Sequence, residues 1–391
     1  MTNKKSILMI CSWLDLSKGI GVFFFNQAVA LNDNFSLTLL NFKPLKINFK
    51  NINQFNELLK IKYVVTDEGI EVLYISYPVI FKIHFLEKIL QRIAIKKVNN
   101  YLNTKSISID LIHAQSLFDA GFFALNYSKI FRIPFIITEH NQLTMKNTNN
   151  KRIRLIEKIL NTSKRNLVVS DDLVRQFATN GFFQDFLNVG NMVDENIFNT
   201  ENRINSRFFE IITVGAYTPV KDQITILNAL KLIDYPLEKK IRFTWVGING
   251  WGGDFEKEVK KIIEDYNFIN IEIVIAKYAT SHEIANFLKQ SDLFLTSSLC
   301  ETFGVSVLES LACGVPVITT QSGGINETIS LENGRIIRIK DSEAMANHIE
   351  NIIKGNLIFD KKTISKQIIE KYGLGYFKAK MSSIYKLAIG I

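Results

Sequence analysis

The stretch ETFGVSVLESLACGVPVITTQSGGINE, residues 301–327, decides the fold. Glu301 opens it, and a helical pattern then carries a second carboxylate, Glu309. The apolar run at 315–319 indicates a buried strand, and the Gly-Gly pair at 323–324 indicates a turn. A loop, a helix and a buried strand in this order are typical of a parallel sheet covered by helices.

The same alternation extends through the rest of the chain. It predicts an α/β fold with two Rossmann-like, doubly wound domains facing each other across a cleft, where the site is expected. Strands are expected at Ile7–Ile10, Leu37–Leu40, Val72–Ile75, Leu111–His113, Phe135–Thr138, Leu167–Val169, Ile211–Val214, Arg242–Val246, Ile271–Ile275, Leu293–Thr296 and Pro316–Thr319. Helices are expected at Phe24–Leu31, Phe85–Leu102, Ala120–Ile130, Ile153–Leu160, Ile224–Leu232, Asp254–Tyr266, Ser281–Lys289, Ser306–Ala312 and Ser342–Lys354.

The length and one polar stretch predict the domain boundaries. The 391 residues are too many for one ordinary core. The polar stretch NIFNTENRINSRF, residues 196–208, is typical of a linker. We therefore expect one domain over 1–197 and a second over 198–370. An amphipathic helix within 371–391 is expected to cross back to the first domain.

The composition excludes several classes of protein. A hydrophobic content of 47% is that of a globular chain, and no apolar run reaches the roughly 18 residues that span a bilayer. Cys11, Cys300 and Cys313 lack a CxxC spacing, which disfavours disulfides and zinc. The first apolar run fits a buried strand better than a signal peptide, so we expect a cytoplasmic protein.

The net charge of +9 lies mostly in the first half of the chain. Residues 1–197 contain 24 Lys and Arg against 16 Asp and Glu, and the remainder contains 23 against 22. A basic half favours an anionic partner. No basic stripe interleaved with aromatic residues is present, which disfavours nucleic acid. An anionic membrane face or a phosphate-bearing acceptor fits better.

The segment 82–102 carries part of this charge. It places Lys88, Arg92 and Lys96 one turn apart, with apolar residues on another face. Such a helix either rests on an anionic bilayer or packs on the sheet with a solvated basic face. The sequence leaves both interpretations open.

Glycines after the first strand suggest a place where a backbone can approach a phosphate. Gly19 and Gly21 follow the strand and open a helix, whose amino end is partly positive. A simple tight turn is the alternative. The pattern is not GxGxxG, because Phe24 occupies the last glycine position, and a nicotinamide dinucleotide site is therefore disfavoured.

A second loop, at 214–222, leads from a strand through Gly215 to Lys221 at a helix start. A lysine there can neutralise a diphosphate leaving group. A surface lysine at a helix end is the alternative interpretation. Cations at helix amino ends are unfavourable by roughly 0.3–1 kcal/mol, and this cost favours a functional role.

The two carboxylates suit a polyhydroxylated ligand. Each carboxylate has two acceptor oxygens, which match vicinal hydroxyls. Solvent-exposed glutamates are common, but Glu309 lies between Leu308 and Leu311 in an otherwise apolar helix. Desolvating a polar group there costs roughly 2 kcal/mol or more, which favours a ligand.

In these residues and motifs, the chain resembles the "glycosyl transferases group 1" family, the retaining GT-B nucleotide-sugar transferases. The family's E-x7-E element matches Glu301 and Glu309. Further segments agree in order over nearly the whole chain: GIGVFFFNQAVAL (19–31), DLIHAQS (110–116), ITEHN (137–141), VVSDDLVRQF (168–177), NMVDENIF (191–198), VGAYTPVKD (214–222) and SDLFLTSS (291–298).

The resemblance implies a role for each matching residue. Lys221, Glu301 and His113 would be catalytic, with Lys221 on the diphosphate and Glu301 on the donor sugar. The donor would be held, in the second domain and at the first glycine loop, by Gly19, Gly21, Gly215, Lys221, Glu301, Thr302, Phe303, Gly304, Val305 and, on the ribose, Glu309. The acceptor side, in the first domain, would comprise His113, Gln115, Glu139 and His140.

The chain departs from the family's pattern at two positions. Ala216 stands where the family usually has an arginine that contacts the diphosphate. Gln115 stands where the second histidine of an H-x-H pair is usual, and an amide cannot shuttle a proton. His140 is a candidate for that polar role. A structural, hydrogen-bonded histidine is the alternative for both His140 and His113.

The resemblance implies a retaining hexosyltransferase that moves a sugar from a nucleotide-diphosphate donor, by default a UDP-sugar, to a saccharide or lipid-linked acceptor. Building a surface polysaccharide is the expected role, with no cofactor and no metal, since Asp171 and Asp172 fit a helix cap better than a metal motif. Peripheral contact with the inner face of the membrane is also expected. Two rivals remain open: a non-catalytic subunit that binds a partner enzyme, and a sugar-nucleotide 2-epimerase.

Overall fold

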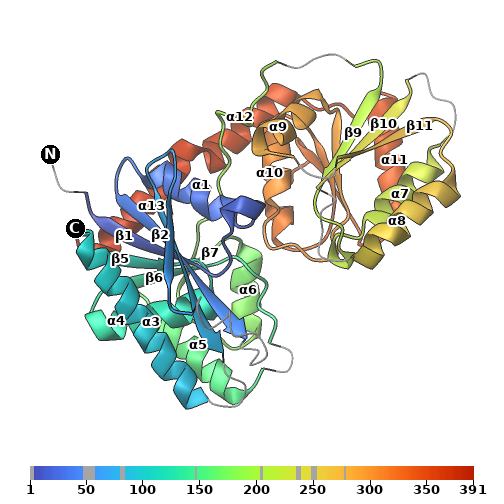
Figure 1. Ribbon diagram of the computed structural model, residues 1–391. Helices are drawn as coiled ribbons and strands as arrows, with labels where there is room; N and C mark the ends of the chain where they lie inside the picture. Colours follow the sequence, from blue (N-terminus) through green and yellow to red (C-terminus); the bar gives the residue numbers. More distant parts are fainter. Residues whose placement is uncertain are drawn as a thin grey trace. The chain divides into compact units, whose positions relative to one another are not determined.

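The structure is a computed structural model that describes residues 4–46, 58–79, 84–145, 148–202, 206–234, 239–247, 253–276 and 279–391. The chain folds into two compact units (Figure 1). Unit 1 comprises Met1–Val169, Leu173–Val189 and Lys378–Ile391, and unit 2 comprises Ser170–Asp172 and Gly190–Phe377. The division after Val189 precedes the polar stretch at 196–208 by a few residues.

Unit 1 is built on an eight-stranded sheet with the order β3-β4-β2-β1-β5-β6-β7-β8. All neighbours are parallel except β3 and β4. The central strand β1 is fully buried from Ile7 to Cys11, which explains its continuous apolar run. The strands are β1 (Ser6–Cys11), β2 (Ser36–Lys46), β3 (Ile61–Val65), β4 (Glu71–Val79), β5 (Leu111–Ala114), β6 (Phe135–Glu139), β7 (Asn166–Val168) and β8 (Phe186–Asn188).

Helices cover both faces of this sheet. Figure 1 shows α3, α4 and α5 on one face and α1 and α13 on the other. The helices are α1 (Val22–Leu31), α3 (His84–Thr104), α4 (Phe122–Phe131), α5 (Asn150–Thr162), α6 (Asp171–Thr179) and α13 (Leu374–Ile389). The strand order reverses between β1 and β5, so the loops that follow these two strands flank a topological switch point, where such sheets bind ligands.

Unit 2 has a six-stranded parallel sheet with the order β11-β10-β9-β12-β13-β14. Its switch point lies between β9 and β12. The strands are β9 (Phe209–Val214), β10 (Ile241–Val246), β11 (Ile271–Ala276), β12 (Leu293–Thr296), β13 (Val317–Thr320) and β14 (Gly334–Ile337). The helices are α7 (Gln223–Leu232), α8 (Gly253–Tyr266), α9 (Ser281–Gln290), α10 (Val305–Ala312), α11 (Ser342–Ile353) and α12 (Lys361–Tyr372), with α7, α8 and α11 on one face (Figure 1).

The expected strands and helices are all present, with ends that shift by a few residues. The sequence did not predict β3, β8, β14 or α12. Strand β3 lies at the sheet edge, where Tyr63, Val64 and Val65 are exposed, so it lacks the buried pattern that identified the other strands. β8 and β14 contain polar residues and are only partly buried, so neither forms the apolar run that identified equally short strands such as β7.

The basic helix expected at 82–102 is α3, and it begins at His84. Residues 82 and 83 lie outside the described residues, as does the side chain of Lys88. Arg92 and Lys96 are exposed, and so is Ile93, one of the apolar residues of this segment. Among the helices of the described residues, none has the length and apolar character needed to cross a bilayer.

Candidate functional site

The loop after β9 places Lys221 beside the switch point of unit 2. The Gly215 amide donates to the Val246 carbonyl (2.9 Å), and the Gly215 carbonyl accepts from the Trp245 indole (3.2 Å). A short 3-10 turn, Pro219–Lys221, then leads to α7. A Cβ at position 215 would lie 3.9 Å from Lys221 Cε, an ordinary contact, so the loop places Gly215 beside this lysine.

The loop after β12 brings Glu301 to the same place. The Ser297 hydroxyl donates to the carbonyls of Lys221 (3.0 Å) and Asp222 (2.7 Å), which ties the two loops together. Lys221 Nζ and Glu301 Oε2 then pair at 2.5 Å, and the Ser298 hydroxyl lies 3.4 Å from the same oxygen. The structure therefore joins two of the residues predicted for the site and adds two serines that the sequence reasoning missed.

The ion pair is accessible to a ligand. The Lys221 side chain is 31% exposed and that of Glu301 is 17% exposed. A partly exposed pair of this kind contributes only about 0–1 kcal/mol to stability. An incoming phosphate, which forms stronger charge-assisted hydrogen bonds, can therefore compete for the ammonium group.

Two glycines hold the backbone that follows Glu301. The Glu301 amide donates to the Ser322 carbonyl (2.7 Å), and the Gly324 amide donates to the Glu301 carbonyl (3.0 Å). A Cβ on Gly324 would meet the Thr302 carbonyl oxygen at 1.9 Å, so only glycine fits. The turn predicted at 323–324 thus fixes the segment that carries Glu301.

The segment ends at the amino terminus of α10. Gly304 has φ +83°, and a Cβ there would lie 2.8 Å from the Ile325 side chain, so glycine is required twice over. Phe303 is buried, while Thr302 and Val305 are half-buried, so this segment can offer the Thr302 hydroxyl and its backbone amides to a ligand. The first turn of α10 holds no acidic residue, so its positive end is available to an anion.

Glu309 projects from the buried helix α10. Its neighbours Val307, Leu308 and Leu311 are fully buried, and Glu309 itself is half-buried. Burial raises the pKa of the Glu309 carboxyl to about 8. Within the described residues its carboxyl oxygens form no hydrogen bond or ion pair, which is the state expected of a group that a ligand satisfies.

In unit 1, the first glycine loop closes on itself. The backbones of Asp15 and Ile20 pair at 3.0 Å, and Gly19 has φ +66°. Gly21 has φ +70° and caps α1, and a Cβ on it would meet the Trp13 carbonyl at 2.3 Å. The loop after β1 therefore needs both glycines to reach the helix, and the side chain of Lys18 lies outside the described part.

The predicted acceptor-side residues form a buried polar chain. His113 Nδ1 lies 2.7 Å from the Tyr385 hydroxyl, and its Nε2 lies 2.7 Å from the Thr138 hydroxyl. The Gln115 amide connects this histidine to His140, whose Nε2 lies 2.8 Å from Gln115 Oε1. Burial lowers the pKa of both His113 and His140 to about 3, so both imidazoles are neutral at physiological pH.

These contacts favour a structural histidine at position 113. His113 is 1% exposed and both of its ring nitrogens have partners. His140 differs, because its buried Nδ1 has no partner among the described groups and its ring contacts Phe23 and Phe24. The catalytic role of His113 stays a prediction, as do the acceptor-side roles of Gln115 and His140.

Glu139 fixes the loops that surround this chain of hydrogen-bonded side chains. Its carboxylate accepts hydrogen bonds from the backbone amides of Leu117 (2.7 Å), His140 (2.9 Å) and Asn141 (2.7 Å). Burial raises the pKa of Glu139, while these three bonds oppose the rise. The carboxylate is thus committed to shaping the loops after β5 and β6.

Removing the Tyr385 hydroxyl tests the structural interpretation. We expect Tyr385→Phe to destabilise the protein by about 1–3 kcal/mol, because His113 then keeps a buried nitrogen without a partner. Thermal unfolding against Tyr63→Phe, an exposed tyrosine of β3, measures the effect. Equal melting temperatures for both variants and the natural protein would contradict it.

Asp171 and Asp172 lie in the first turn of α6, at the helix start where the sequence places them. Their backbone amides donate to the carboxylate of Glu327 at 2.9 Å and 2.7 Å. Glu327 thus also satisfies amides at the start of α6, and the capping role of the two aspartate side chains stays a prediction. Over the described ranges, no cluster of three or more His, Cys, Asp or Glu side chains has the geometry to hold a metal ion.

Comparisons with known proteins follow the same division of the chain. Residues 194–371 match the family model "Glycosyl transferases group 1", and residues 63–193 match "Glycosyltransferase Family 4". An uncharacterized glycosyltransferase of Methanocaldococcus jannaschii is 25% identical over 236 residues, which are 59% of this chain and 63% of the relative. The match thus spans less than two thirds of that relative.

Two solved structures match almost the entire chain. Sucrose-phosphate synthase from Thermosynechococcus elongatus aligns with a TM-score of 0.76 at 14% identity, over 99% of this chain and 100% of the other. HepE from Anabaena, solved in complex with UDP and glucose, aligns with a TM-score of 0.72 at 17% identity, over 98% and 100%. They confirm the α/β fold class expected from the sequence.

Proposed function

Because the chain belongs to the glycosyl transferases group 1 family and has the GT-B fold class, we propose that it transfers a sugar from a nucleotide-diphosphate donor to a hydroxyl acceptor. The observation that carries the proposal is the set of groups in unit 2. Lys221 and Glu301 form an exchangeable ion pair, and Glu309 holds a carboxyl group that has no hydrogen-bond or ion-pair partner among the residues that the structure describes. These are a cation for a diphosphate and two acceptors for hydroxyls.

We assign the groups as follows. Lys221 and the amides at the start of α10 stabilise the charge that develops on the departing diphosphate. Glu301 positions the sugar hydroxyls, and Glu309 accepts hydrogen bonds from the two ribose hydroxyls. Gly215 and Gly304 let the backbone approach the ligand.

The reaction we propose retains the configuration of the sugar. The bond between the anomeric carbon and the diphosphate oxygen breaks, and the acceptor oxygen bonds to the same face of an oxocarbenium-like sugar. The acceptor proton passes to an oxygen of the leaving diphosphate. This course needs no side-chain base. It is compatible with His113, whose two ring nitrogens are both hydrogen-bonded to protein groups, and with Gln115, whose amide cannot take a proton. We propose no metal and no cofactor.

A UDP-sugar is the donor we propose, and the complex of HepE with UDP and glucose supports this choice. The acceptor is a saccharide or a lipid-linked saccharide of a surface polysaccharide. The basic first half of the chain would suit a cytoplasmic enzyme working beside an anionic membrane face.

The direct test is turnover with a panel of UDP-, GDP- and ADP-sugars and of free and lipid-linked saccharides. We expect release of one nucleoside diphosphate only when an acceptor is present. Conversion of the donor without an acceptor would instead support the 2-epimerase. If the protein neither turned over nor bound any nucleotide of the panel, the remaining hypothesis would be a non-catalytic subunit. Ala216 and Gln115, which stand where the family usually has an arginine and a histidine, motivate that hypothesis.

A further inference from the structure

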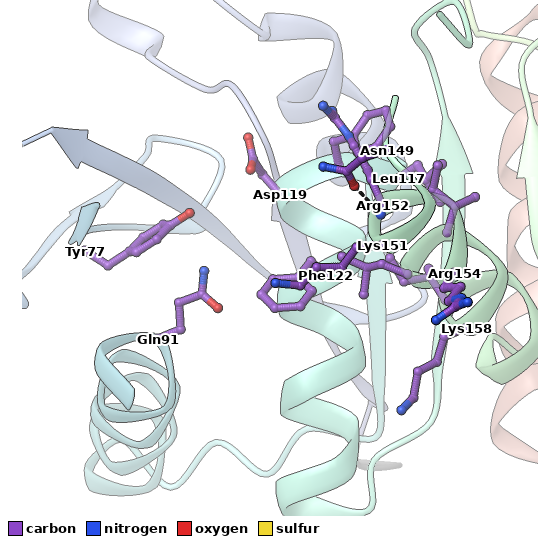
Figure 2. A pocket seen from close by; sticks show the side chains of 14 residues that line it. Tyr77, Gln91, Leu117, Asp119, Phe122, Asn149, Lys151, Arg152, Arg154 and Lys158 are labelled. Atoms are coloured by element: carbon purple, nitrogen blue, oxygen red, sulfur yellow. Dashed lines mark hydrogen bonds between the residues drawn. The ribbon is translucent and has the colours of Figure 1, made fainter. Parts of the chain in front are cut away.

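Unit 1 contains a groove of about 710 Å³ between α3, α4 and α5 (Figure 2). Its inner wall is apolar and includes Leu117, Phe122, Ile156 and Ile159. Its rim along α5 is cationic and consists of Lys151, Arg152, Arg154 and Lys158. A cavity of this size is typical of a small-molecule site. It combines an apolar wall with a positively charged rim.

The cations of the rim are available for an anion. Over the described ranges, none of the four forms an ion pair with a carboxylate. The Arg152 guanidinium lies 3.9 Å from the centroid of the Phe118 ring, a cation–π contact that holds it at the wall of the groove. Lys158 faces Lys129 on α4, and burial together with this second ammonium lowers the pKa of Lys129 to about 8. Like charges gathered in this way favour a bound anion.

A buried amide on the opposite side points to a polar ligand. Gln91 of α3 is 6% exposed and lines the groove, and its amide makes no hydrogen bond within the described part of the chain. Figure 2 shows Gln91 on the α3 side of the groove, with Phe122 between it and the cations Arg154 and Lys158. The amide has no protein partner among the described residues and lines the groove, so it can hydrogen-bond the polar part of a ligand that reaches this depth.

The groove is also lined by Asp119, whose backbone is strained. Asp119 has φ +58° and ψ −69° in the turn after β5, a conformation that is unfavourable for a non-glycine residue. The Ser12 and Ser116 hydroxyls both donate to the Phe118 carbonyl, at 2.8 Å and 2.6 Å, and hold the turn in place. Its exposed carboxylate suits a hydroxyl donor rather than the anion itself.

We propose that this groove holds the acceptor, and that the acceptor is an amphiphile in which a phosphate or diphosphate joins a sugar to an apolar chain. The α5 cations bind the phosphate, the apolar wall takes the first carbons of the chain, and Gln91 and Asp119 contact the polar head. An inorganic phosphate would leave the apolar wall unused, and a neutral lipid would leave the four cations unused. This inference rests on the proposed function, because it names the acceptor class of that reaction.

The probe is farnesyl diphosphate, compared with pyrophosphate and with farnesol in binding calorimetry on the full chain. We expect farnesyl diphosphate to bind at least about tenfold more tightly than either fragment. The double variant Lys151→Gln/Arg152→Gln should weaken its binding about tenfold or more. The matched control is Lys164→Gln/Arg165→Gln, a second exposed Lys-Arg pair of unit 1 that lies off the groove, and it should change the affinity less than twofold.

A second variant separates binding from folding. Gln91→Leu should weaken farnesyl diphosphate severalfold and should also raise the melting temperature of the free protein, because it removes an amide without a partner. A variant that lost binding through misfolding would show a lower melting temperature instead.

Three results would overturn the proposal. Pyrophosphate binding as tightly as farnesyl diphosphate would make the groove a plain phosphate site. Unchanged affinity for farnesyl diphosphate in Lys151→Gln/Arg152→Gln would show that the ligand binds somewhere other than this groove. Binding to vesicles of anionic phospholipid, without binding of the monomeric probe, would make α5 a membrane contact. A preparation that binds farnesyl diphosphate but no nucleoside diphosphate would instead contradict the proposed transfer reaction and leave the groove assignment standing.

Discussion

Lys221→Gln should lower the turnover number about 10²–10³-fold, the effect typical of removing one group that stabilises charge in a transition state. The ammonium group is the only cation that unit 2 is shown to place beside Glu301 in the described residues, and Ala216 supplies none. Glutamine keeps the length and polarity of the side chain but not its charge. Steady-state kinetics with the donor found in the panel measures the effect.

Lys231→Gln is the matched control for this prediction. Lys231 forms an ion pair with Asp234, at 3.3 Å, at the other end of α7. Lys231 is exposed, and the buried Asp234 carboxylate keeps the hydrogen bonds that it accepts from the backbone amides of Ile269 and Asn270 when the lysine is replaced. We expect both variants to fold with similar stability, because partly exposed pairs contribute little. A Lys221→Gln enzyme within threefold of the natural rate would remove the lysine from the mechanism.

Glu309→Gln should weaken nucleoside diphosphate binding about 10–100-fold, since hydrogen bonds to a charged group contribute about 1.5–3 kcal/mol. UDP compared with 2′,3′-dideoxy-UDP isolates the ribose hydroxyls. In the natural protein the advantage of UDP should grow as the pH rises from 6 to 9, because the carboxyl ionises around its pKa of about 8. In Glu309→Gln the amide oxygen still accepts a hydrogen bond but cannot ionise, so the advantage of UDP should be smaller and should not change with pH.

The same variant should be more stable than the natural protein at high pH. The ordinary pKa of the carboxyl is 4.5, and burial raises it to about 8 in the folded state. The folded state therefore holds the proton more tightly, and stability falls as the pH rises from about 4.5 to about 8. Glutamine has no proton to lose, so at pH 9 it should stabilise the free protein by up to roughly 5 kcal/mol, with no difference at pH 4.

Glu350→Gln provides the control for both effects. Glu350 is a half-exposed glutamate of α11 that pairs with Lys354 at 2.8 Å. It should change neither the UDP affinity nor the pH dependence of the melting temperature. Loss of stability in Glu309→Gln at pH 9, together with unchanged UDP affinity, would show that Glu309 is an ordinary packing residue.

The fold was largely predictable because its central strands are buried on both faces. Strand β1, for example, is therefore a continuous apolar run from Ile7 to Cys11 that stands out against the helices. β3 was not predictable, because an exposed edge strand lacks that signal. The order of the strands could not be obtained from the sequence at all, since burial patterns carry no information about which strands are neighbours.

The site was predictable only where a local signal existed. Gly304 and the turn at 323–324 could be recognised in the sequence, because glycine is needed where φ is positive or the backbone approaches closely. The pairing of Lys221 with Glu301 depends on the adjacency of β9 and β12. The hydrogen bond between His113 and Tyr385 joins residues 272 positions apart, so the sequence left the role of that histidine open.

The most direct measurement is a crystal structure of the protein with UDP and, where it binds, the intact donor sugar. We predict that the diphosphate lies within hydrogen-bond distance of Lys221 Nζ and of the first amides of α10. The ribose hydroxyls should lie on Glu309 and the sugar hydroxyls on Glu301. A nucleotide bound away from unit 2, or bound there with Glu301 and Glu309 both facing solvent, would contradict the account.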